Sequence, residues 1–389
     1  MFSCSNIVMN YNSIAEKLGD IDWKWDEAAQ NLQQAESVLN EELLFHYRLI
    51  DAYGAIQLAM GKHEENAFDK VKDKNGFLYS GNFWNEFGDD TQELAVRTRR
   101  LQLQLEEQGV KFGVVLFPEN VPEEDARYYG IPYNDFGYSA DTYAAWARYY
   151  GVPVLNLKDN WKENGLSQKD AFFRTDHHWT PLAAFYGYCA IVDWLDTSLN
   201  LSVPYKSQLL DLNNFQVVPY GDVMFGSQGR ETGLIFAGGP ESYTAIYPKE
   251  EGRYLLKTGK IEDYDVHEGG FSQALMWTDY HLESYDDWYS ANAENTYLYS
   301  GVADYTSVQN LDNPSGKKIL LLRDSYATPV GAFLSQSFSQ VDMLWIGEYT
   351  AEELETYLQE NKYDYVLLTL YPDNLSYSFF PFGMTEDSE

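Results

Sequence analysis

The chain has 389 residues, 44% of them hydrophobic, which is enough for one large domain or for one domain with a smaller appendage. Its 60 acidic residues against 27 basic ones give a formal net charge of −33, which argues against nucleic acid as a partner and disfavours docking on anionic lipid. This charge fits a soluble protein that binds neutral or weakly charged ligands. The alternative is that the acidic residues serve solubility alone. Aromatic residues make up 16% of the chain, and their flat faces suit sugars as well as large β-rich interfaces.

The amino-terminal half begins with a helical pattern. Residues 12–62 space their apolar residues three and four apart, which predicts helix. A turn at Asn75-Gly76 then leads into a short strand within residues 72–84. Helices and strands alternate after that, with helices expected over 91–109, 139–151 and 180–195 and strands over 111–120 and 152–159.

The composition and pattern of the sequence change in the carboxy-terminal half. Residues 200–310 are rich in Tyr, Asp, Gly and Ser in short alternating runs, which predicts an irregular β-containing insertion. Alternation then resumes, with strands expected over 316–326, 340–347 and 363–371 and helices over 328–338 and 351–362. The pattern predicts an α/β fold with a doubly wound sheet. We divide the chain into an amino-terminal helical segment (1–65), a core (66–199 with 311–380) and the insertion (200–310).

Neither the cysteines nor the termini fix the compartment. Cys4 and Cys189 are the two cysteines, so no disulfide framework and no CxxC metal motif is present. No stretch is long enough to span a membrane, and the amino terminus lacks the basic and apolar regions of a signal peptide. These features indicate either a cytoplasmic protein or a chain whose leader is missing.

Ser325 stands where a strand meets a helix, in the stretch LLLRDSYATP. In an open α/β sheet, ligands bind beyond the carboxyl ends of the strands. A serine there faces solvent, and the amides at the start of the following helix can hold an oxyanion. The alternative interpretation is that Ser325 only caps the helix.

A nucleophilic serine needs a base, and only six histidines are available. His177 and His178 follow a predicted strand in the stretch FFRTDHHWTP. In an extended or turn-like backbone, Asp176 and His178 project to the same side, so the carboxylate can hold Nδ1 and leave Nε2 for a hydroxyl. We expect His177 to point the other way. A histidine with only a structural role in the loop is the alternative.

The Asp-His-His string also suggests a divalent metal ion, because these side chains are common ligands. Adjacent histidines rarely share one ion, however, since their side chains diverge. The phosphoesterases that carry Asp-His-His also need upstream Asp clusters and a downstream glycine-rich histidine motif, and neither is evident here. G-x-S-x-G, P-loop and G-x-G-x-x-G motifs are absent as well, so we expect neither a metal nor a cofactor.

Two separated motifs carry a family resemblance. DHHW at 176–179, followed far downstream by ILLLRDSYATPVGAFL at 319–334, resembles the DHHW protein family, which is related to the SGNH-hydrolase-like domains of alginate O-acetyltransferases. KNGFLYSGN at 74–82 resembles a strand signature near the start of those domains. The likeness covers roughly residues 65–200 and 285–375. It implies an SGNH-hydrolase-like, flavodoxin-like parallel sheet flanked by helices.

The resemblance also implies roles for individual residues. Asp176 orients the base His178, and Ser325 is the nucleophile. Other positions are implied to support the site: Trp179 and His177 around the base, Asn295 as an oxyanion donor, and Arg323 and Tyr326 flanking the nucleophile in the pocket.

The function that this resemblance implies is serine-dependent acetyl transfer or ester hydrolysis through an acyl-serine, on a cell-surface or extracellular polysaccharide. A polysaccharide or oligosaccharide acceptor would face the insertion, a membrane-bound acyltransferase would supply acetyl groups, and the location would be extracytoplasmic. The sequence leaves transfer and hydrolysis open. A non-catalytic glycan-binding or polysaccharide-assembly module on the same scaffold is the alternative.

Overall fold

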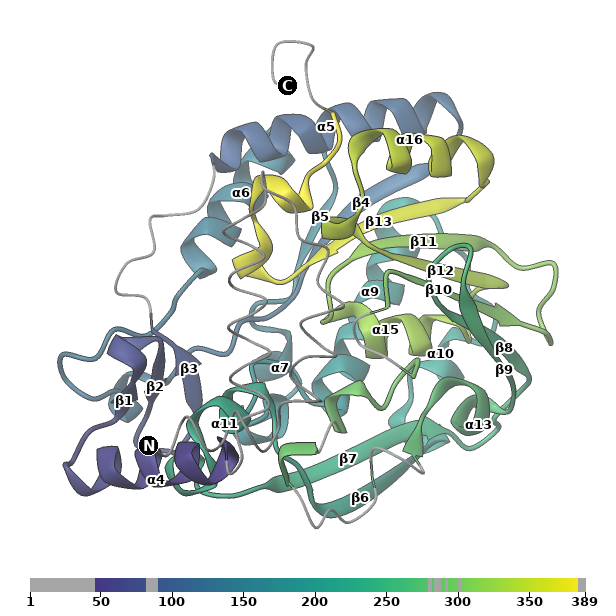
Figure 1. Cartoon of the computed structure of the whole chain (residues 1–389). Coiled ribbons are helices and arrows are strands. Elements are labelled where there is room, and N and C mark those ends of the chain that lie inside the picture. Colours follow the sequence, from purple (N-terminus) through teal and green to yellow (C-terminus); the bar gives the residue numbers. More distant parts are fainter. Residues whose placement is uncertain are drawn as a thin grey trace, which may run out of the picture.

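The computed structural model describes residues 46–81, 90–278, 282, 288–290, 293–299 and 303–383 (Figure 1). Its central element is an eight-stranded sheet whose first five strands run parallel and whose last three pair antiparallel. In spatial order the strands are β5 (Val154–Asn156), β4 (Lys111–Leu116), β13 (Tyr365–Leu370), β11 (Lys318–Arg323), β12 (Gln340–Trp345), β10 (Tyr305–Asn310), β8 (Tyr254–Gly259) and β9 (Tyr264–Gly269).

Both faces of the parallel part are covered, as continuous apolar strands require. Successive side chains of β11 alternate between two cores: Ile319 and Leu321 pack with the first, Leu320 and Leu322 with the second. The long helix α9 (Pro181–Leu199) and the helix α15 (Ala327–Leu334) pack in the first core. Three others cover the opposite face: α5 (Thr91–Glu107), α6 (Gly137–Tyr149) and α16 (Ala351–Glu360). This doubly covered sheet confirms the predicted α/β fold.

Part of the region between residues 200 and 310 belongs to this sheet. Strands β8, β9 and β10 extend it beyond β12, whereas β6 (Phe215–Met224) and β7 (Glu241–Pro248) form a separate antiparallel pair. The division of the chain at residues 200 and 310 stays a prediction. The remaining short helices are α7 (Asn160–Glu163), α8 (Gln168–Ala171), α10 (Lys206–Leu209), α11 (Ser227–Thr232), α12 (Leu234–Ala237) and α13 (Phe271–Leu275).

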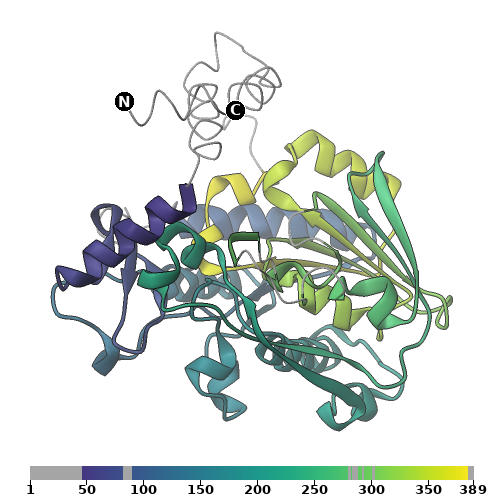
Figure 2. The same ribbon diagram turned by 60° about the horizontal axis from the view of Figure 1, so that its bottom comes forward.

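The amino-terminal elements lie at one end of the molecule. Helix α4 (His46–Ala59) and the small sheet β1 (Glu64–Glu65), β2 (Lys70–Lys72) and β3 (Leu78–Ser80) are at the end opposite β8 and β9 in both ribbon views (Figure 2). Of the helix expected over 12–62, residues 46–59 are helical, and residues 12–45 lie outside the described part of the chain.

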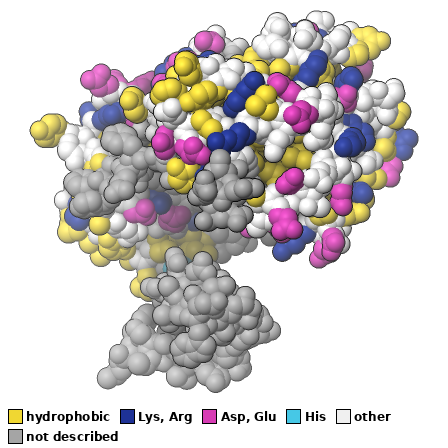
Figure 3. All heavy atoms as spheres, turned by 90° about the horizontal axis from the view of Figure 1, so that it is seen from above, with side chains coloured by type: hydrophobic (Ala, Val, Ile, Leu, Met, Phe, Trp, Pro, Cys, Tyr) yellow, Lys and Arg dark blue, Asp and Glu magenta, His cyan; other side chains and the backbone are white. Residues whose placement is uncertain are grey.

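Two further findings concern the helices of the described residues and the charges on one face. Within those ranges, no helix has both the length and the apolar character that crossing a bilayer demands. On the face shown in Figure 3, Lys and Arg side chains stand among Asp and Glu side chains instead of gathering in one patch.

The packing of α5 predicts a contrast between two leucines on one helix. Leu101 is 2% exposed in the core, and Leu103 is 44% exposed. We expect Leu101→Ala to lower the free energy of unfolding by about 2–5 kcal/mol, because the substitution leaves a cavity, and Leu103→Ala to change it by about 0.5 kcal/mol or less. Urea denaturation measures both, and equal losses would contradict the assigned packing.

Candidate functional site

Three side chains from two distant segments form one hydrogen-bonded chain. His178 Nδ1 lies 2.6 Å from Asp176 Oδ1, and His178 Nε2 lies 2.7 Å from Ser325 Oγ. His178 and Ser325 are 147 positions apart in the sequence, and the sheet topology brings them together. This is the geometry in which a carboxylate orients an imidazole and the imidazole accepts a hydroxyl proton.

Ser325 lies in the turn between β11 and α15, and Asp324 fixes that turn. The Asp324 carboxylate accepts hydrogen bonds from the backbone N–H of Tyr326 at 3.0 Å and of Tyr371 at 2.5 Å, and from Asn374 Nδ2 at 2.9 Å. It therefore ties the turn that carries Ser325 to the end of the neighbouring strand β13. Sequence reasoning missed this role, although an aspartate at the end of an apolar strand was a usable signal.

Both oxygens of the buried Asp176 carboxylate are occupied. Oδ1 accepts from the backbone N–H of His178 at 2.9 Å as well as facing its ring, and Oδ2 accepts from the backbone N–H of Ser227 at 2.8 Å and from Ser227 Oγ at 3.1 Å. Ser227 begins α11, within the predicted insertion. No pattern around it in the sequence marks it as a partner of Asp176.

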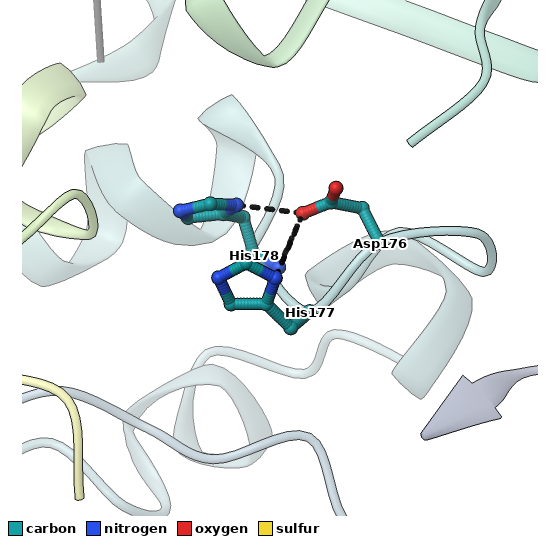
Figure 4. A group of neighbouring side chains, drawn as sticks. All are labelled: Asp176, His177 and His178. Carbon is teal, nitrogen blue, oxygen red and sulfur yellow. Dashed lines mark hydrogen bonds and ion pairs between the residues drawn. The ribbon is translucent and has the colours of Figure 1, made fainter. Parts of the chain in front are cut away.

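We expected the His177 side chain to point away from Asp176. It points toward Asp176 instead. Its Nδ1 lies 3.6 Å from Asp176 Oδ1, and its ring centroid lies 4.0 Å from that of His178. Figure 4 shows both rings converging on the same carboxylate oxygen. The reason is that residues 174–178 form a bend, so neighbouring side chains are not on opposite sides.

The charges of the three residues are coupled. Burial raises the pKa of Asp176, but attraction to His178 and His177 outweighs it and holds that pKa well below the usual range. Burial lowers the pKa of His178, yet Asp176 outweighs it and raises that pKa above 6.5. Burial and the neighbouring His178 lower the pKa of His177 to about 4. His178 is therefore the stronger base of the two histidines.

Ser325 and His178 open onto a cavity of about 320 Å³. Asn295 and His177 also line it, as does Trp179, whose Nε1 donates to the carbonyl of Tyr326 at 3.1 Å. Its walls are largely aromatic, with rings from Phe173, Trp179, Tyr243, Tyr297, Trp345 and Phe379. Flat apolar walls with a few convergent polar groups are typical of small-molecule and sugar sites.

Arg323 and Tyr326, which we expected to line the pocket, are both 1% exposed and are not among the residues that line the cavity. Arg323 lies over the Trp345 ring and donates to the carbonyl of Ala303 at 2.7 Å. The Tyr326 hydroxyl donates to the carbonyl of His177. These two residues support the site from within the core.

Asp176, His177 and His178 also present one ligand atom each within 4.8 Å of one another, a donor set that a divalent metal ion can use. In the geometry described, His178 Nδ1 faces Asp176 and Nε2 faces Ser325. Coordination of a metal by either nitrogen would displace one of these hydrogen bonds. The metal-binding and the hydrogen-bonded arrangements therefore exclude each other at His178.

The close approach of α11 to Asp176 depends on Gly226. A Cβ atom there would lie 2.3 Å from Asp176 Cβ and 2.6 Å from the Thr175 carbonyl oxygen, whereas a Cβ at Gly221 would meet nothing within 4 Å. We expect Gly226→Ala to lower the free energy of unfolding by about 1–3 kcal/mol through overpacking, and Gly221→Ala to change it by about 0.5 kcal/mol or less. Equal stability of the two variants in urea denaturation would show that the contact is not tight.

Comparisons with known proteins concern the fold of the chain. Residues 76–211 match the family model of the SGNH hydrolase-like domain of the acetyltransferase AlgX, a range that includes Asp176 and His178 but not Ser325. No curated protein sequence matches the chain.

Three solved structures are similar in fold. The structure of Bacillus cereus PatB1 has a TM-score of 0.61 at 20% identity, covering 80% of this chain and 99% of that one. The structure of Bacillus cereus PatB1 with a sulfonyl adduct has a TM-score of 0.57 at 18% identity, covering 80% of this chain and 99% of that one. The structure of a DHHW family protein from Eubacterium siraeum has a TM-score of 0.53 at 18% identity, covering 80% of this chain and 96% of that one. The resemblance predicted from the motifs is thus confirmed: the chain has an SGNH hydrolase-like fold and is similar to the AlgX domain and to a DHHW family protein.

Proposed function

We propose that this protein is a serine-dependent acyltransferase or esterase that acts on acetylated glycans. The observation that carries the proposal is the Asp176–His178–Ser325 hydrogen-bonded chain at the wall of an aromatic cavity. Two similarities add support: the matching family model is that of an acetyltransferase domain, and PatB1 has been solved with a sulfonyl adduct.

In the first step, His178 Nε2 takes the proton of Ser325 as Oγ attacks the ester carbonyl carbon. Proton transfer by a positioned base is worth roughly 10²–10⁴-fold in rate. The oxyanion is held by Asn295, which lines the cavity, and by the backbone amide of Ser325; each such donor is worth roughly 10²–10³-fold. The protonated His178 then returns its proton to the leaving alcohol, and the acyl group stays on Ser325.

In the second step, the acyl-serine is resolved by a hydroxyl that His178 deprotonates. A sugar hydroxyl gives transfer and water gives hydrolysis, so acceptor binding decides between them. The aromatic walls suit the apolar face of a pyranose ring. We further propose an extracytoplasmic location, a polysaccharide as acceptor and a membrane-bound acyltransferase that supplies the acetyl groups. These three points rest on the family resemblance.

Replacement of the nucleophile is the first test. We expect Ser325→Ala to lower kcat for p-nitrophenyl acetate at least about 10³-fold, since no other group forms the acyl intermediate. Ser207→Ala changes an exposed serine on α10 and should leave kcat unchanged. Release of p-nitrophenol is followed by absorbance, and thermal melts verify folding.

Full activity in Ser325→Ala would refute the mechanism. A wild-type protein that neither hydrolyses the ester nor is labelled by a sulfonyl fluoride, but still binds oligosaccharide, would favour the non-catalytic module.

The pH dependence is a second test. His178 must be neutral to accept a proton, and Asp176 raises its pKa above 6.5, so kcat/KM should rise with pH to a midpoint above that value. Asp176→Asn removes the attraction that favours the imidazolium, so the midpoint should move to lower pH while kcat falls by roughly 10²–10⁴-fold. The surface variant Asp141→Asn is the control. A midpoint that stays in place in Asp176→Asn would contradict the assigned pairing.

A further inference from the structure

Glu294 is an acidic residue that lines the same cavity. It lies in the short 3₁₀ helix Ala293–Asn295 and lines the cavity together with Ser325 and His178. Its side chain is 9% exposed. Oε1 accepts a hydrogen bond from Arg230 Nη2 at 2.7 Å, and Oε2 is buried.

The cation that pairs with Glu294 lies behind it. Arg230 is not among the residues that line the cavity, and its Nη1 is held by the carbonyl of Phe225 at 2.7 Å. Among the described residues, the lining of the cavity includes no Lys and no Arg. The negative charge of the pair therefore belongs to a residue that lines the cavity and the positive charge to one that does not, in a partly desolvated site where charges interact more strongly than in water.

We infer that Glu294 determines specificity, so that the cavity accepts uncharged or cationic groups and rejects anionic ones. This inference rests on the proposed function and narrows its substrate class to neutral or amino-bearing sugars and esters. Sugars that carry a carboxylate or a phosphate next to the reacting hydroxyl are excluded.

The test compares three aryl sulfonyl fluorides of different charge: benzenesulfonyl fluoride, 4-(fluorosulfonyl)benzoate and 4-(2-aminoethyl)benzenesulfonyl fluoride. With each, Ser325 Oγ forms a bond to sulfur, the sulfur–fluorine bond breaks, fluoride leaves and the serine proton passes through His178 to solvent. Intact-protein mass spectrometry gives the labelling rates. Because burial raises the pKa of Glu294, the reactions are run at about pH 8, well above the usual carboxylate range.

For each probe the rate for wild type is divided by the rate for Glu294→Gln, which cancels the intrinsic reactivity of the probe. A general effect on His178 changes all three ratios alike. We expect the ratio for the cationic probe to exceed that for the anionic probe at least about 10-fold, with the neutral probe between them. The exposed variant Glu352→Gln should give the same ratio for all three. If Glu294→Gln melts at markedly lower temperature, the double variant Arg230→Gln/Glu294→Gln, which removes both charges, replaces it.

Three ratios that agree within about 2-fold would overturn the inference about Glu294 while leaving the proposed function intact. No labelling of Ser325 by any of the probes would instead overturn the proposed function, and the inference with it.

Discussion

A buried carboxylate is costly unless every oxygen finds a partner, and this requirement organises the site around Asp176. The residue is 1% exposed, and its two oxygens serve different parts of the chain. Oδ1 holds the ring and the backbone of His178, and Oδ2 holds the start of α11 through Ser227. His178 and a helix from the predicted insertion are thus fixed by the same group, with Gly226 allowing the approach.

A second set of contacts joins the loop that carries His178 to the turn that carries Ser325. The Tyr326 hydroxyl donates to the carbonyl of His177, and Trp179 Nε1 donates back to the carbonyl of Tyr326. The Tyr326 ring also stacks on Tyr371, whose backbone N–H is held by Asp324. These reciprocal bonds limit relative movement of His178 and Ser325. Pre-organisation of this kind is what proton transfer between them requires.

The parallel sheet and its helices were predictable because their signals are local. Mostly apolar runs predicted β4, β11, β12 and β13, and the helix expected over 180–195 is α9, where Thr180 Oγ1 accepts from the Ala183 N–H. That His178 and Ser325 belong to one site followed from two motifs that resemble a known family, together with the rule that ligands bind at the carboxyl ends of parallel strands.

The remaining features depend on contacts between distant segments. Ser227 and Glu294 lie in a region whose polar residues show no periodicity, so no spacing connects them with Asp176 or Arg230. The extension of the main sheet by β8, β9 and β10 depends on strand pairing, which local sequence does not specify. The direction of the His177 side chain was predicted wrongly because we assumed that successive side chains alternate, whereas residues 174–178 form a bend.

The central claim is that Asp176 makes His178 a base poised against Ser325, and an NMR titration of the imidazole tests it most directly. The signal is assigned by its loss in His178→Gln. The account predicts a pKa above 6.5 in the wild-type protein and a lower pKa in Asp176→Asn, because the imidazolium then loses its carboxylate. A wild-type pKa at or below 6.5 that does not change in Asp176→Asn would contradict it.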